Sequence, residues 1–132
     1  MKKIVCFLIT ILLFFCACTP YKSWLGKRPC DQPNTQWVSE NGQIYINVDE
    51  NGQSKGTILV GTEKQDIYFG IGLGGTINVY SKRSEDGYRD ADRIEHWVGD
   101  FNKENEFIVI VKETTYFEIG QKINFYRVDK ED

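Results

Sequence analysis

The sequence predicts an all-β domain: an antiparallel meander of about eight strands that closes into a small barrel or a flattened sandwich. Proline is absent from Gln36 onward, and apolar residues there recur at every second position. This alternation places one set of side chains on each face of a sheet. Turn-forming residues separate the runs at intervals of about 8 to 12 residues, which is typical of all-β domains. Closure is favoured because it removes exposed strand edges.

The strands are expected from the alternating runs, taken in chain order. The runs cover residues 37–39, 43–48, 56–59, 66–71, 76–80, 94–101, 106–112 and 122–128. In the run 44–48 every second residue is Ile or Val, with Tyr45 and Asn47 between them. The run 106–112 is apolar on both faces, because Ile108 and Ile110 alternate with Phe and Val.

The connections between these runs carry hairpin signals. Asn41-Gly42 and Asn51-Gly52 supply the positive φ angles that two-residue hairpin turns require, and Gly74-Gly75 does the same between two later runs. Residues 102–105 form a short polar break. Residues 90–97 are compatible with a helical turn, but a strand that starts near Arg93 is favoured.

The first 17 residues have the pattern of a bacterial export signal. Lys2 and Lys3 precede the apolar run 4–17, in which Thr10 is the one clearly polar residue. A membrane-spanning helix needs about 20 apolar residues, so this run is too short for a retained span. Residues 1–17 are therefore predicted to be a signal helix that is removed on export.

The end of this run resembles the lipobox of bacterial lipoproteins. Ala17 is the small residue and Cys18 the cysteine that follows it, after Phe15 and Cys16. The resemblance implies that Cys18 is acylated and becomes the new N-terminus. The protein would then be anchored to the extracytoplasmic face of the cell membrane, because each buried CH₂ of the lipid contributes about 0.8 kcal/mol. Ordinary secretion with a Cys18–Cys30 disulfide is the alternative.

The mature chain divides into a tether, residues 18–35, and a folded domain, residues 36–132. The tether contains all three prolines and no periodic apolar pattern. The leader holds two lysines and no acidic residue, so its removal lowers the formal net charge from −3 to −5. This negative charge argues against nucleic acid as a partner.

Several motifs have structural explanations that are favoured over functional ones. Residues 70–75 match G-x-G-x-x-G, but a strand follows where a dinucleotide site needs a helix. Asp49, Asn51 and Gly52 resemble the start of a calcium loop but fit a hairpin turn better. His96 is the single histidine, so neither a zinc site nor a histidine-dependent nucleophile is expected.

The polar stretch 82–92 is interpreted as a solvated connection between strands. A long binding loop is the less favoured alternative. Chemistry based on carboxylates alone remains open, since the chain contains nineteen acidic residues.

The domain resembles uncharacterised small bacterial lipoproteins. The similarity lies in Trp37-Val38-Ser39, the alternation 44–48, Trp97-Val98-Gly99 and the closing segment 120–127. The opening Trp37 and closing Arg127 also resemble lipocalin-like barrels, although Thr35 stands where that signature has Gly. Neither resemblance implies a catalytic residue.

The expected function is that of a lipid-anchored cell-envelope protein with a non-enzymatic binding or interaction module. Its partner would be a protein or a small molecule, and no cofactor or metal is expected. An eight-stranded barrel has little internal space, so the contact is expected on the surface or at the barrel mouth. A small envelope hydrolase that uses carboxylates, and an inhibitor of a lysozyme or protease that presents residues 82–92, are the alternatives.

Overall fold

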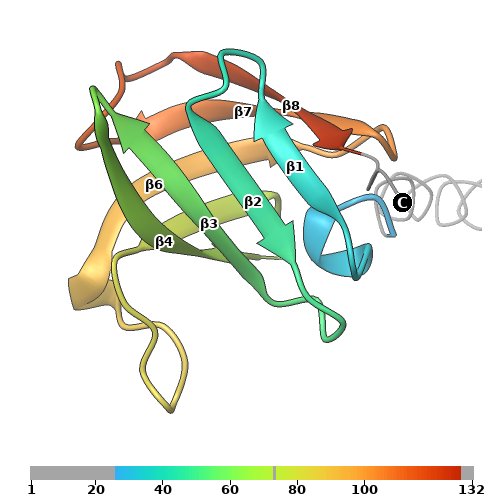
Figure 1. Cartoon of the computed structure of the whole chain (residues 1–132), viewed down its shortest axis with the longest axis horizontal. Helices are drawn as coiled ribbons and strands as arrows, with labels where there is room; N and C mark the ends of the chain where they lie inside the picture. Colours follow the sequence, from blue (N-terminus) through green and yellow to red (C-terminus); the bar gives the residue numbers. More distant parts are fainter. Residues whose placement is uncertain (1–25, 73, 129–132) are drawn as a thin grey trace, which may run out of the picture.

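The chain forms a closed barrel of eight antiparallel strands, seen in a computed structural model that describes residues 26–72 and 74–128 (Figure 1). Each strand pairs with the next one along the chain, and β1 also pairs with β8. The predicted all-β meander is therefore confirmed, and its closed form is a barrel. The strands are β1 (Gln36–Ser39), β2 (Ile44–Val48), β3 (Ser54–Val60), β4 (Glu63–Ile71), β5 (Thr76–Tyr80), β6 (Arg93–Asp100), β7 (Glu106–Glu113) and β8 (Lys122–Val128). The predicted signal helix and Cys18 lie outside the described residues.

Every predicted strand is present, and the main differences are at strand ends. β3 and β4 both extend further than the alternating pattern indicated, and they meet through a tight connection at Gly61, which has φ +63°. The residues added to these strands are mostly polar, so hydrophobic periodicity could not detect them. In the region 90–97, helical structure is limited to one 3₁₀ turn, η2 (Asp90–Asp92). The strand β6 begins at Arg93, which is the start that the sequence favoured.

The barrel interior is packed with apolar side chains. Phe107 stacks on Phe125 with ring centroids 4.6 Å apart, and Trp37 meets Phe107 edge-on at 5.3 Å. Trp97 is completely buried beside them. Aromatic pairs in these geometries add to the free energy gained by burying their area. The remaining core residues are Ile44, Ile46, Val48, Ile58, Ile67, Phe69, Ile77, Val79, Phe101, Val109, Val111 and Ile123.

Residues 26–35, called the cap below, lie at the barrel end where β1 begins (Figure 1). The cap contains the 3₁₀ turn η1 (Pro29–Asp31). It bonds to each of the neighbouring segments at this end: Lys27 Nζ to Asn102 O at 3.0 Å, Arg28 Nη1 to Gly72 O at 3.4 Å, Asn34 N to Asp49 O at 3.2 Å, and Arg127 Nη1 to Gln32 Oε1 at 3.1 Å.

The cap belongs to the segment 18–35 that was predicted to be a tether. Its prolines and its lack of periodicity gave no sign of packing, yet Arg28 and Pro29 are buried against the barrel. Arg28 donates two hydrogen bonds to Asp31, of 2.6 and 2.8 Å, which compensate for burying its charge. The folded part of the chain therefore extends back at least to Gly26.

The opposite end of the barrel is closed by the loop between β7 and β8. Because β5 pairs only with the second half of β4, the first half of β4 has no β5 neighbour. Tyr116 from the loop bonds to Gln65 on this part of β4, and Phe117 packs edge-on against Trp97 at 5.9 Å. The two ends of the barrel are thus filled by side chains from different loops.

Candidate functional site

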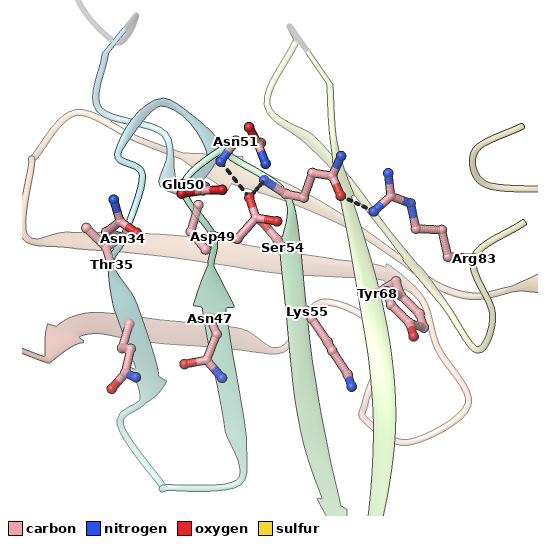
Figure 2. Close-up of a pocket in the computed structure, with 13 residues that line it drawn as sticks. Asn34, Thr35, Asn47, Asp49, Glu50, Asn51, Ser54, Lys55, Tyr68 and Arg83 are labelled. Atoms are coloured by element: carbon pink, nitrogen blue, oxygen red, sulfur yellow. Dashed lines mark hydrogen bonds between the residues drawn. The ribbon is translucent and has the colours of Figure 1, made fainter. Parts of the chain in front are cut away.

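The outer wall of the barrel carries an open groove of about 670 Å³ near the capped end (Figure 2). Its walls come from the cap, from the first four strands, from the hairpin between β2 and β3, and from the loop that follows β5. The lining residues are Asn34, Thr35, Gln36, Asn47, Val48, Asp49, Glu50, Asn51, Gln53, Ser54, Lys55, Tyr68 and Arg83.

The floor of the groove is a row of four side chains that the strand register sets side by side. Gln36 is opposite Asn47, Asn47 is opposite Lys55, and Lys55 is opposite Tyr68. Neighbouring strands lie about 4.8 Å apart, so the row spans roughly 14 Å around the barrel. We call these four residues the groove row. Their positions alternate with inward-facing core residues, which is why all four face outward.

The hairpin that borders the groove is held by its own side chains. One carboxylate oxygen of Asp49 accepts hydrogen bonds from the backbone N–H groups of Asn51 (2.8 Å) and Gln53 (2.9 Å) (Figure 2). Gly52 adopts φ +77°, and an added Cβ there would lie 2.5 Å from Cys30 O of the cap. Asp49, Asn51 and Gly52 thus belong to a hairpin turn, which is the interpretation that the sequence favoured over a calcium loop.

Asn34, which belongs to the cap, forms one corner of the groove. It is the one non-glycine residue of the described chain with a positive φ, at +61°, a conformation that Asn tolerates better than most residues. Its neighbour Thr35 accepts a hydrogen bond from Trp37 Nε1 (2.9 Å) and donates one to Gln32 O (2.6 Å). The Thr at the position where the lipocalin signature has Gly therefore links the cap to the barrel core.

The loop after β5, residues 81–92, is anchored on the outer wall at one side of the groove. Tyr88 stacks on Tyr80 with ring centroids 4.5 Å apart, and its hydroxyl donates to Phe69 O at 3.1 Å. This burial raises the pKa of Tyr88. Arg83 reaches the groove and bonds to Gln53 (Figure 2). Part of the predicted polar loop thus borders the groove, while Tyr88 fixes its base.

Charges within the groove are balanced. Lys55 and Arg83 supply two positive charges, and Asp49 and Glu50 supply two negative ones. In the cap, the Arg28 guanidinium lowers the pKa of Asp31 through their hydrogen bonds. Burial raises the pKa of the Cys30 thiol, which is free in this structure. A thiol with a raised pKa is mostly protonated at neutral pH and reacts slowly.

The other sequence candidates lie outside the groove. His96 faces outward from β6 and its Nδ1 lies 2.8 Å from Asn78 Oδ1. Residues 70–75 of the glycine motif fall at the β4–β5 connection, and β5 follows as a strand, as expected. Among residues 26–72 and 74–128, no three His, Cys, Asp or Glu side chains gather in a way that could hold a metal ion.

Sequence reasoning did not find the groove row. Gln36, Asn47, Lys55 and Tyr68 each occupy an ordinary outward position of an alternating strand, and polar residues are common at such positions. Only the register between the strands aligns them. The distances in sequence between these four residues do not reveal the alignment, because register depends on how separate strands pair.

Comparison with protein-family models, curated proteins and solved structures finds no match to this chain. In the described residues, no helix has the length and apolar character needed to cross a membrane.

Proposed function

We propose that this protein is a lipid-anchored cell-envelope protein whose barrel is a non-enzymatic binding module, with its ligand site in the outer-wall groove. The observation that carries the proposal is the contrast between the interior and this wall. The interior is occupied by two tryptophans and by closely packed Phe, Ile and Val side chains. Ligand sites are usually concave and have a few polar groups that fix orientation. The groove has this form, and the filled interior does not.

The anchoring part of the proposal rests on the leader and on Cys18. Gly26, where the described cap begins, lies eight positions after Cys18 in the sequence. A chain of that length spans at most about 29 Å when fully extended. An acylated Cys18 would therefore hold the capped end of the barrel close to the membrane surface. The groove opens sideways on the wall beside that end.

Substitution of Cys18 tests the anchoring directly. We expect the unaltered chain to fractionate with membranes and its intact mass to include added acyl chains. Cys18→Ala should abolish the added mass and leave the chain out of the mature membrane fraction. Cys30→Ala is the matched control and should behave as the unaltered chain does. A mature chain without acyl mass, or with a Cys18–Cys30 disulfide, would refute the anchoring.

Hydrogen exchange tests the binding site. Solubilised cell-envelope material is added to the full-length chain, and amide protection is mapped along the barrel. We expect protection of the β2–β3 hairpin and of neighbouring strand ends, with loss of that protection in an Asn47→Ala, Tyr68→Ala double variant. Protection restricted to residues 82–92 would instead favour the inhibitor alternative. Breakdown of the added material, lost on replacing an acidic residue, would favour the hydrolase.

A further inference from the structure

We infer that the outer-wall groove binds a neutral saccharide, an inference that rests on the binding function proposed above. The groove brings together five carboxamide side chains, one half-buried tyrosine and a balanced set of charges. No single one of these features identifies a ligand. Their combination on one wall identifies the class of ligand, because each feature argues against a different class of other ligands. The carboxamides are those of Asn34, Gln36, Asn47, Asn51 and Gln53.

The carboxamides match the chemistry of a polyhydroxylated ligand. Each one presents both an N–H₂ donor and a carbonyl acceptor on a planar group. A sugar hydroxyl is likewise both donor and acceptor, so adjacent hydroxyls can pair with one amide. In the described structure, the side chains of Asn34, Gln36 and Asn47 have no hydrogen-bond partner within the protein. Their hydrogen-bonding groups are therefore available to a ligand.

The wall around these side chains is firmly held. Asp49 organises the hairpin backbone, and the contact between Gln53 and Arg83 connects the hairpin with the loop after β5 (Figure 2). Gln53 therefore stabilises the wall, while the carboxamides without a partner face the groove. Fixed walls reduce the entropy that is lost when a ligand binds.

Tyr68 supplies an aromatic surface at one end of the groove row. Its side chain is partly buried, with Lys55 beside it on β3 (Figure 2). No hydrogen bond of its hydroxyl is found in the described part of the chain. A tyrosine ring offers an apolar face together with a polar tip. This suits a sugar ring, which has C–H faces and hydroxyl edges.

Anions and extended peptides fit the groove less well. Two positive and two negative side chains line it, so it has no net charge with which to attract an anion. A peptide that adds as a strand needs an open sheet edge, and each of the four groove-row residues is paired with a neighbouring strand on both sides. The roughly 14 Å length of the groove row suits a ligand of a few linked rings.

Binding of three named oligosaccharides tests the inference. Chitotriose, cellotriose and maltotriose are titrated into the full-length chain by calorimetry and by saturation-transfer NMR, in a detergent without a sugar headgroup. We expect at least one of them to bind. Tyr68→Ala and Asn47→Ala should each weaken that binding by about tenfold. Tyr126→Ala, an exposed tyrosine on β8 outside the groove, is the matched control and should bind normally.

A hexapeptide and citrate are titrated in parallel, so that two kinds of failure can be told apart. Binding of the peptide or of citrate that the groove variants abolish, without saccharide binding, would overturn the saccharide inference and leave the proposed function standing. Saccharide binding that survives both groove variants would also overturn the inference. If none of the three sugars binds, the inference falls, and hydrogen exchange with envelope material decides the proposed function separately. Circular dichroism verifies that each variant is folded.

Discussion

Inside the barrel, Trp97 Nε1 donates a hydrogen bond to Glu95 Oε2 across 2.9 Å. The two residues share the inward face of β6, and Glu95 is 1% exposed. Its other oxygen accepts hydrogen bonds from the loop after β7: from the backbone N–H groups of Thr115 (2.5 Å) and Tyr116 (3.2 Å) and from the Thr114 hydroxyl (3.1 Å). A single buried carboxylate thus joins the core to the loop that closes the barrel.

Replacement of Glu95 is expected to destabilise the barrel. Glu95→Ala leaves several buried donors without an acceptor, and we expect a loss of about 3 kcal/mol in the free energy of unfolding. Glu95→Gln keeps the shape and one acceptor oxygen, so its loss should be about half as large. Urea denaturation measures both. Equal stability of Glu95→Ala and the unaltered chain would show that the loop closes the barrel without this carboxylate.

Gly56 is required where β3 approaches its neighbours. A Cβ at this position would lie 2.2 Å from the backbone oxygen of Tyr45 and 2.7 Å from the Phe69 ring. We expect Gly56→Ala to lower the free energy of unfolding by about 2–3 kcal/mol, because the backbone oxygen of Tyr45 cannot move away freely. Gly74→Ala is the control, since nothing lies within 4 Å of its added Cβ. Thermal unfolding of the two variants should differ clearly, and a stable Gly56→Ala protein would contradict this packing.

The contact between Arg28 and Asp31 makes the stability of the cap depend on pH. Because Arg28 lowers the pKa of Asp31 below its ordinary value of 3.8, the stabilisation is fully present above that pH. It is lost as the pH falls through the lowered pKa of the folded state. We expect Asp31→Asn to lower the free energy of unfolding, measured by urea denaturation, by about 1 kcal/mol at pH 7. The difference should disappear in strong acid, and a difference independent of pH would disprove the assignment.

Tyr88 is expected to control the opening of the loop 81–92. Tyr88→Ala removes the stack on Tyr80 and the hydrogen bond to Phe69 O. Losing both should speed local opening by about tenfold. Trypsin cleavage after Lys82 or Arg83 measures this opening, and Tyr45→Ala, an exposed tyrosine elsewhere on the wall, is the control. Unchanged cleavage rates would mean that the loop is held by other contacts.

The sequence by itself determined the strands of this protein. The alternation of Ile44, Ile46 and Val48 with polar residues is enough to assign β2 and its buried face, because a strand turns its side chains over every two residues. Asn-Gly pairs located the turns for the same local reason. The meander follows from these short connections, since consecutive strands then pair with one another. The leader and Cys18 are also features of sequence alone, and their role stays a prediction.

The tertiary structure decided what depends on distant residues. Whether eight strands close into a barrel or a sandwich is settled by the pairing of β1 with β8, nearly the whole domain apart. The cap was missed because its contacts run from Arg28 to Gly72 and from Lys27 to Asn102, with no local pattern. The groove row was missed because strand register, a non-local property, aligns Gln36 with Tyr68. Local periodicity fixes which face a side chain takes, and only chain closure fixes which side chains become neighbours.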